Sequence, residues 1–358
     1  MKSPPRARAD PAARTWRRIA AIGAALAALV VLRLFVERPL GGAASFGWPE
    51  EAIRTLRMTA IAAALSVGAA LGVAGVFLQG LLRNPLAEPF ILGVSGGAGL
   101  GVTIALAFAW AGTAGSSIAG FAAPEWLPGA ELVADAVRQL GLVLPAAIGG
   151  IAALVAVIAL GQRRGAPDPL ALVLAGVVVS TMCGAVVLLL QHLSPQGLRS
   201  DLAAWMIGRI PEAVEPALLV VVSALAIAGV ALGAALGRSM DAATFGDDEA
   251  HAVGVPLRRL RWTLGIASGL LAAAAVTVAG PIAFVGLVAP HLVRSLAGAR
   301  HAPLVVGAAL AGGALLLAAD ILRQLVDLGG GRIPVGIFAA LAGGPVFLVL
   351  LRRGKGFG

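Results

Sequence analysis

The sequence predicts an all-α protein that crosses a membrane about ten times, and three observations support this fold class. Of the 358 residues, 59% are hydrophobic and 13% are charged, whereas a soluble domain usually carries about 25% charged residues. The mean hydropathy is +0.94, which excludes a disordered chain, because disorder requires low hydrophobicity and high charge. The apolar residues form long unbroken runs, whereas a transmembrane barrel would alternate apolar and polar residues over roughly 10-residue segments.

Each apolar run is long enough for a membrane-spanning helix, which needs about 20 mostly apolar residues. The predicted spans are residues 18–36, 54–80, 90–111, 141–161, 169–192, 215–237, 262–279, 281–297, 303–324 and 334–351. The seventh and eighth form one stretch that is too long for a single span, and Gly280-Pro281 interrupts it. We therefore expect two helices there, the second of them short. Hydropathy by itself is satisfied by nine or ten spans.

The placement of basic residues predicts the orientation of the chain. Roughly two thirds of the 27 basic residues fall on the side that holds both termini, and the positive-inside rule makes this side cytoplasmic. We expect a basic tail at 1–17, one transmembrane domain at 18–352 and a second cytoplasmic tail at 353–358. The net charge of +9 then reflects membrane topology, and we expect no nucleic-acid partner, because the basic residues form no stripe along a polar face.

Residues 1–45 share some features of a cleaved signal peptide, since basic residues precede an apolar run. The run is longer than the roughly 7–15 residues of a signal sequence. Its removal would also weaken the charge asymmetry. We therefore expect this segment to be retained as the first span.

Glycines four residues apart predict close helix packing. Gly68 and Gly72 share one helix face, as do Gly229, Gly233 and Gly237. Small residues on one face let two helix backbones approach closely. The pattern favours packing within one subunit, and a seam between two subunits is the alternative.

The chain has no sequence signature of its own energy source. The G-x-x-x-x-G-K-[ST] loop of ATPases is absent, and the only lysines are Lys2 and Lys355. No acidic residue lies at the centre of a predicted span, and Asp320, near the outer end of the ninth, comes closest. Ion-coupled carriers need ionisable groups within their spans. No His, Cys, Asp and Glu residues have metal-ligand spacing. We therefore expect a transport subunit rather than an enzyme, with no cofactor or metal of its own.

An intramembrane hydrolase is a competing class, because Gly93, Ser95 and Gly97 match G-x-S-x-G. This motif indicates catalysis only on a strand–turn–helix or beside a base. We interpret it instead as a closely packed helix start. Together with Gln79 on the preceding span, these residues are assigned to the pathway or to helix packing.

Four longer segments carry a family resemblance. They are GVFLQGLLRNPLAEPFILGVSGGA at 75–98, FGDDEAHAVGV at 245–255, GPIAFVGLVAPHLVR at 280–294, and the series ADILR, IPVGI and GPVFL between 319 and 348. In this order and spacing they resemble the permease family of bacterial type II ABC importers, which carry ferric siderophores, haem and cobalamin. The resemblance extends from about residue 50 to the C-terminus. It implies ten helices per subunit and a homodimer with a central pathway in the inner membrane. It also implies two partner ATPase subunits that bind ATP and Mg²⁺, and a periplasmic binding protein.

The resemblance also implies a cytoplasmic gate. The prolines of RNPLAEP cannot continue a helix, so the chain must turn and re-enter the bundle there. By resemblance, Asn84 and Leu86 help to form the gate, and Pro169 and Leu170 form the opposing part. An ordinary turn between spans is the alternative.

The loop at 238–261 is the longest polar segment between cytoplasmic span ends. Asp241 or Thr244 is suited to cap a short helix, with the acidic run DDE in its favourable first turn. By resemblance this is the coupling helix that docks on the ATPase, and a solvated connector is the alternative. The implied coupling residues are Asp247, Asp248, Glu249 and Gly254.

Arginines near the outer span ends suggest a docking surface. By resemblance Arg54, Arg57 and Arg323 meet acidic residues of the binding protein, and interfacial anchoring is the alternative. With Arg332 they would make the outer mouth positive, which suits an anionic cargo. We therefore expect import of an iron chelate, with haem favoured over a ferric siderophore or cobalamin. A passive channel or an ion-coupled carrier is the alternative from another class.

Overall fold

The computed structural model describes residues 11–37, 45–114, 141–163, 165–194, 196–326 and 333–352. Most of the N-terminal tail, the C-terminal tail and Arg332 lie outside the described residues, so the predictions for them stay predictions.

The described part is a bundle of helices, and every predicted span corresponds to one of them. The helices are α1 (Pro11–Phe35), α2 (Glu51–Leu82), the 3₁₀ helix η1 (Pro89–Leu92), α3 (Val94–Ala114), α5 (Val143–Leu160), α6 (Pro169–Leu193), α7 (Gln196–Met206), α8 (Pro216–Ala243), α9 (Asp247–Ala252), α10 (Leu257–Ala279), α11 (Val285–Ala297), α12 (His301–Leu325) and α13 (Val335–Arg352). Among the described residues, seven helices are long and apolar enough to cross a membrane. Shorter apolar stretches lie in α3, α11 and α13.

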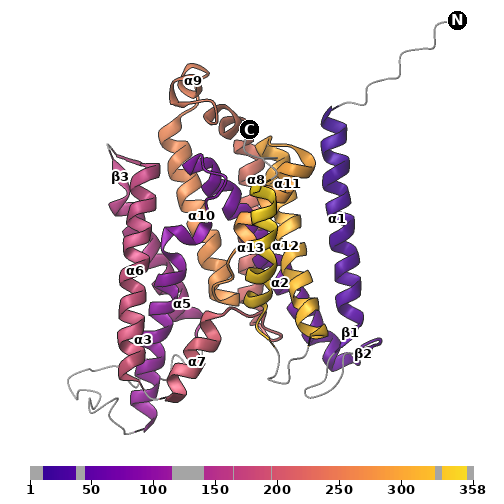
Figure 1. Cartoon of the computed structure of the whole chain (residues 1–358), viewed down its shortest axis with the longest axis vertical. Coiled ribbons are helices and arrows are strands. Elements are labelled where there is room, and N and C mark those ends of the chain that lie inside the picture. Colours follow the sequence, from indigo (N-terminus) through magenta and orange to yellow (C-terminus); the bar gives the residue numbers. More distant parts are fainter. Residues whose placement is uncertain are drawn as a thin grey trace, which may run out of the picture.

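Helix α2 lies at the centre of the bundle (Figure 1) and packs against α8, α10, α11 and α12. Helices α3, α5 and α6 form a group on one side, whereas α1 lies on the opposite side and packs mainly against α12. The short helix α9, the start of α1 and the end of α13 lie at the same end of the bundle (Figure 1). Two ladders of two residues each, β1 (Val36–Glu37) with β2 (Ser45–Phe46) and β3 (Gln162–Arg163) with β4 (Ala166–Pro167), close loops at the helix ends.

The glycine faces pack within the chain. A Cβ atom added to Gly68 would lie 2.4 Å from the carbonyl oxygen of Gly312, and one added to Gly72 would lie 2.2 Å from that of Ala308. Only glycine therefore lets α2 and α12 approach this closely. Gly233 and Gly237 likewise face side chains and backbone of α12. These contacts favour packing within one subunit, as the sequence pattern suggested.

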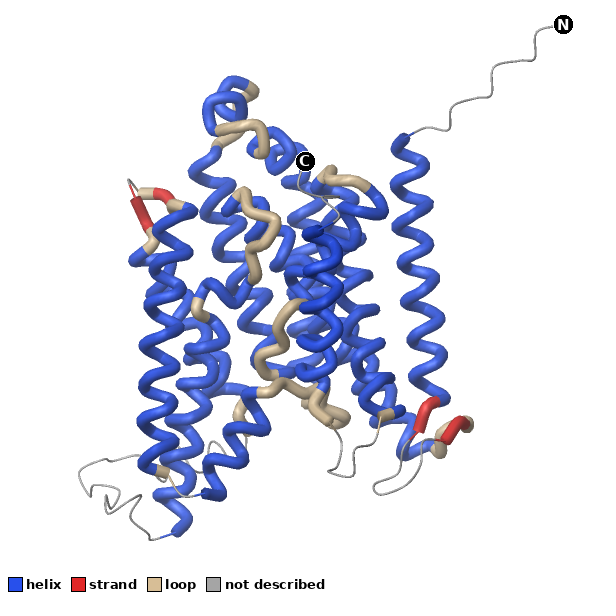
Figure 2. Tube along the Cα trace, in the orientation of Figure 1, coloured by secondary structure: helices blue, strands red, loops and turns tan. Residues whose placement is uncertain are grey.

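Irregular backbone interrupts the bundle at mid-height, where Figure 2 shows tan segments among the helices. Helical structure is interrupted between α10 and α11 at residues 280–284, as the Gly280-Pro281 signal predicted. The loop after α7 binds this break, because the Arg209 N–H donates to the carbonyl of Ala279 at 2.7 Å. Irregular backbone is tolerated at this depth only where protein covers its polar groups.

Helix α7 is an element that the sequence reading missed. It has 11 residues and includes Arg199 and Asp201, so it forms no apolar run. It lies against α3 and leads into the loop that binds the α10–α11 break. Hydropathy cannot detect a helix of this kind, because its place is set by contacts to other helices.

Candidate functional site

The turn after α2, residues 83–86 (the RNPL turn), ends the central helix abruptly. Arg83 adopts a left-handed conformation with φ of 47°, and its N–H donates to the carbonyl of Gln79. The Asn84 side chain then accepts the N–H of Leu86 at 2.9 Å, which fixes the turn locally. Leu86 remains exposed. The chain therefore turns where the proline signal predicted, and it presents Leu86 outward.

A buried polar cluster holds the re-entrant segment against α2 and α11. The Gln79 amide donates to the carbonyl of Ala87 at 3.2 Å and accepts from Arg294 Nη1 at 2.6 Å. Gln79 is buried, so it fastens the segment and does not line an open pathway in this conformation. Arg294, which comes from α11, was not singled out from the sequence, because its partner is 215 positions away.

Glu88 was also missed by the sequence reading. Its carboxylate accepts the Phe284 N–H at 2.6 Å, and Phe284 is the N-cap residue of α11, with a left-handed φ of 70°. A carboxylate at a helix N-terminus is favourable because the helix dipole places positive partial charge there. In the sequence, the only sign of this role was that Glu88 is an acidic residue within the otherwise uncharged stretch after Arg83 in RNPLAEP. Glu88 thus ties the re-entrant segment to the break between α10 and α11.

The G-x-S-x-G segment is the junction of η1 and α3. Gly93 has a φ of 77° and ends η1, and Ser95 and Gly97 lie in the first turn of α3. A Cβ atom on Gly97 would lie 2.3 Å from the carbonyl oxygen of Gly149 on α5. This junction is a helix start in close contact with a neighbouring helix, without a preceding strand. It lacks the strand–turn–helix context that a nucleophile elbow requires.

The second predicted gate element is the start of α6. Asp168 is its N-cap and accepts the Ala171 N–H at 2.9 Å, and Pro169 occupies the first helical position. This Asp-Pro start is favourable because proline lacks the N–H that a first turn leaves unbonded. Leu170 follows and is exposed. Leu86 and Leu170 are therefore both available for contacts with other groups.

The polar loop forms the predicted short helix, α9. Asp247, Asp248 and Glu249 occupy its first turn, as expected. Its end is a Schellman motif: Gly254 has a φ of 82°, its N–H donates to the carbonyl of His251, and the Val255 N–H donates to that of Ala250. Gly254 thus serves to end α9 by adopting a conformation that other residues rarely adopt.

The predicted cap of α9 was wrong. Gly246 is the N-cap residue of α9, and no side chain caps it. Asp241 lies in α8 and instead accepts the backbone N–H of His301 at 2.9 Å, at the start of α12. Thr244 Oγ1 donates to the carbonyl of Asp241. Spacing along the sequence suggested α9, but the fold brings the N-terminus of α12 closer to Asp241.

Asp247 joins α9 to the RNPL turn. One carboxylate oxygen accepts from Arg83 Nη2, and the other accepts from Arg261 Nη2 at 2.6 Å. Partial burial by itself raises the pKa of Asp247, but the hydrogen bonds and charges of Arg83 and Arg261 outweigh it, so the pKa lies below its ordinary value of 3.8. The Arg83–Asp247–Arg261 cluster therefore connects the end of α2, α9 and the start of α10.

The surface around α9 combines exposed acids with exposed apolar side chains. Asp248 and Glu249 point to the outside of the bundle. Phe245 is 80% exposed and Val253 is 70% exposed, on either side of the helix. The α9 surface therefore presents both charged and apolar side chains to the surroundings.

Comparison with known proteins identifies the family. Residues 44–353 match the FecCD transport family. The chain belongs to this family. It is therefore a multi-pass permease of the type II ABC importer class, as the four motifs suggested.

Individual relatives of this FecCD permease agree with the assignment. The hemin transport system permease protein HmuU of Yersinia pestis is 36% identical over 298 residues, which cover 83% of this chain and 82% of the relative. The cobalamin import system permease protein BtuC of Halobacterium salinarum is also 36% identical, over 86% of this chain and 76% of the relative. A solved ABC transporter of the metal-chelate type, in an inward-facing conformation, superposes with a TM-score of 0.76 at 28% identity, over 95% of this chain and 99% of that one.

The outer arginines of this FecCD permease differ from expectation. Arg57 is only 5% exposed, and its Nη1 donates to the carbonyl of Leu34 on α1 at 2.5 Å. Arg323 is 7% exposed and pairs with Asp320 at 2.8 Å and with Glu212 at 3.4 Å. Both side chains thus hold helices together, and neither is presented to a docking protein. The prediction that they form a docking surface with Arg54 is wrong for these two residues.

Asp320 neutralises the buried positive charge of Arg323. It is fully buried, and its second carboxylate oxygen accepts from Arg33 Nε on α1 at 2.5 Å. Asp320 therefore binds two arginines, which is a structural role and not that of a coupling-ion site. Of the expected docking arginines, Arg54 alone is partly exposed, and it pairs with Glu51 at 3.5 Å.

Proposed function

We propose that this FecCD permease is the membrane-spanning subunit of an ATP-driven importer in a bacterial inner membrane, with both termini in the cytoplasm. It works as a homodimer with the pathway on the twofold axis. Two partner ATPase subunits bind ATP and Mg²⁺, a periplasmic binding protein delivers the cargo, and the permease itself needs no cofactor. The relatives named above are permeases of hemin and cobalamin import systems, which supports this proposal.

One observation carries the coupling role: the exposed α9 surface lies next to an ionic joint that leads to the RNPL turn. Phe245 and Val253 offer apolar contact to an ATPase, and Asp248 and Glu249 offer charge. Asp247 then binds Arg83, the residue just before Asn84. A displacement of α9 would therefore pull directly on the end of α2.

The proposed gate uses the residues on either side of this joint. Asn84 and Leu86 follow Arg83 on the RNPL turn, and Pro169 and Leu170 begin α6. In the dimer, the exposed leucines of both subunits would close the cytoplasmic end of the pathway by apolar contact. When the ATPases move α9, the RNPL turn moves with it, and the pathway opens to one side at a time.

The proposed cargo is haem, and a ferric siderophore or cobalamin is the alternative. The hemin relative supports haem, while the cobalamin relative is equally similar. The positive outer mouth no longer supports an anionic cargo, because Arg57 and Arg323 are buried in structural contacts. Of the three arginines predicted to dock the binding protein, we retain Arg54 alone, because its side chain is partly exposed.

The function is tested by transport into vesicles. The permease is reconstituted with its ATPase and binding protein, and the accumulation of haem, a ferric siderophore and cobalamin is measured in parallel. We expect haem to accumulate with ATP and to stay outside with a non-hydrolysable analogue. Accumulation without ATP would refute the importer. ATP-dependent uptake of another cargo in place of haem would refute haem alone.

A further inference from the structure

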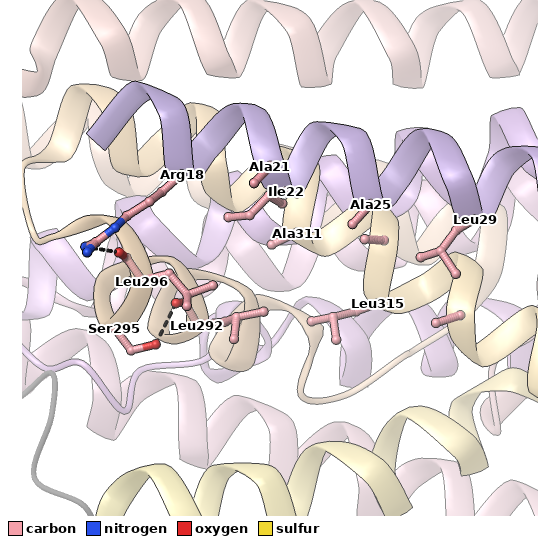
Figure 3. Close-up of a pocket in the computed structure, with 12 residues that line it drawn as sticks. Arg18, Ala21, Ile22, Ala25, Leu29, Leu292, Ser295, Leu296, Ala311 and Leu315 are labelled. Atoms are coloured by element: carbon pink, nitrogen blue, oxygen red, sulfur yellow. Dashed lines mark hydrogen bonds between the residues drawn. The ribbon is translucent and has the colours of Figure 1, made fainter. Parts of the chain in front are cut away.

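A groove runs along α1 on the face that this helix turns towards α11 and α12. Its volume is about 640 Å³, within the roughly 300–1,000 Å³ of small-molecule sites. Its wall is mostly apolar: Ala25 and Leu29 from α1 lie opposite Leu292 of α11 and Leu315 of α12 (Figure 3). Such a wall suits a hydrocarbon chain.

One end of the groove is polar. Arg18 and Ser295 lie there together (Figure 3). Arg18 Nη1 donates to the carbonyl oxygen of Leu296 at 2.6 Å, which holds the guanidinium at the end of α11. A guanidinium carries five N–H donors in a planar fork that matches phosphate. The bond to Leu296 therefore positions Arg18 without using all of its donors.

The length of the groove matches one leaflet of a bilayer. Between Arg18 and Leu29, α1 rises by roughly 16 Å at 1.5 Å per residue. The hydrocarbon core of a bilayer is about 30 Å thick, so the groove covers half of it. Trp16, half exposed beside the polar end, is the residue type that marks the membrane interface.

The surroundings of the polar end favour an anion. Arg14 and Arg17 are exposed on the same turn of α1. Helix α1 also has little protein around it: 11% of its most apolar stretch is buried, against 83% for α2. Polar contacts such as the Arg33–Asp320 pair hold its ends to the bundle, and a filled groove would add apolar contact between them.

We propose that this groove binds one acyl chain of an anionic phospholipid, with the phosphate at Arg18. The lipid fills the space between α1, α11 and α12 and holds α1 against the bundle. One guanidinium in contact with the headgroup favours an anionic lipid by about fivefold. The site does not depend on the cargo. The lipid site rests on the proposed function in one respect only: the orientation of the chain places the groove in the cytoplasmic leaflet.

The test uses the full-length protein, stripped of lipid in detergent and titrated with phosphatidylglycerol or phosphatidylcholine. Native mass spectrometry counts the bound lipid, and thermal unfolding reports the stabilisation that each lipid gives. We expect phosphatidylglycerol to bind about fivefold more tightly and to stabilise more strongly. Arg18→Gln should remove this preference. Ala314→Leu places a larger side chain in the apolar part of the groove. It should therefore remove one bound lipid, whether the lipid is phosphatidylglycerol or phosphatidylcholine.

Arg17→Gln is the matched control, because it removes the same charge one residue away, from a side chain that does not line the groove. We expect it to change phosphatidylglycerol affinity by less than about twofold. Equal losses in Arg17→Gln and Arg18→Gln would mean diffuse attraction and overturn the site. So would equal binding of the two lipids by the unmodified protein, or unchanged lipid retention in Ala314→Leu. If Arg18→Gln lost stability but kept its preference for phosphatidylglycerol, Arg18 would serve only to hold α1 to α11. That result would also overturn the proposed lipid site.

Discussion

Replacing Gly176 by alanine should loosen the re-entrant segment next to the proposed gate. Gly176 lies in α6, and a Cβ atom there would be 1.7 Å from the carbonyl oxygen of Ile91 in η1. Real Cβ atoms essentially never approach within 3.0 Å of another atom, so η1 and α6 must separate by roughly 1.3 Å. The obstacle is backbone, and no side chain can rotate out of the way.

The magnitude follows from two opposing terms. Overpacking of this kind costs about 1–3 kcal/mol of unfolding free energy, whereas alanine is better than glycine inside a helix by about 0.5–1 kcal/mol. Gly184 lies two turns further along α6 and would place its Cβ in open space. Gly184→Ala should therefore be neutral or slightly stabilising. Because the helix term is shared, the difference between the two variants isolates the contact with η1 at about 1–3 kcal/mol.

The assay is equilibrium unfolding of both variants in the same detergent, followed by circular dichroism, together with ATP-dependent uptake in vesicles. We expect Gly176→Ala to unfold more easily than Gly184→Ala and to transport more slowly, because the RNPL turn leads directly into η1. Equal unfolding free energies for the two variants, within about 0.5 kcal/mol, would refute the close contact of η1 with α6.

Three further predictions concern charged groups. Asp320→Asn should cost about 3–5 kcal/mol of unfolding free energy, because it leaves Arg33 buried without a carboxylate and leaves Arg323 only the longer contact with Glu212; a loss below about 1 kcal/mol in detergent unfolding would contradict this. Asp247→Asn should lower the hydrogen-exchange protection of α9 at pH 7. Because the pKa of Asp247 is lowered from 3.8 in the folded protein, its contribution is complete above about pH 5 and is lost as the pH falls through the folded value. The two proteins should then become alike, and a difference that persists in acid would argue against the ion pairs. Glu249→Arg should uncouple ATP hydrolysis from transport with the dimer intact, and unchanged uptake in vesicles would count against docking through α9.

Much of the fold was predictable because membrane insertion is a local property. A run of about 20 apolar residues must form its own backbone hydrogen bonds in lipid, so it becomes a helix wherever it occurs. The Gly280-Pro281 break and the turn after Arg83 were predictable for a similar reason, since proline and glycine act on their own backbone. The acidic first turn of α9 belongs to the same class of signal.

The roles of individual charges were less predictable. Arg57 and Arg323 are near span ends in the sequence, which suggested surface docking, but both are buried in contacts with other helices. Asp247 binds Arg83 across 164 positions, and Glu88 binds Phe284 across 196. Such pairs depend on which helices become neighbours, and composition or periodicity carries no information about this.

The sequence by itself thus determined the membrane class, the spans, the absence of an ATPase loop and the family motifs, because each depends on residues close together in the chain. The tertiary structure decided which charges are structural and which remain on the surface. It joined α9 to the RNPL turn through Asp247 and left α1 beside an open groove. The physical reason is that the energy of a charge depends on its partner and its burial, and both are set only when distant helices pack together.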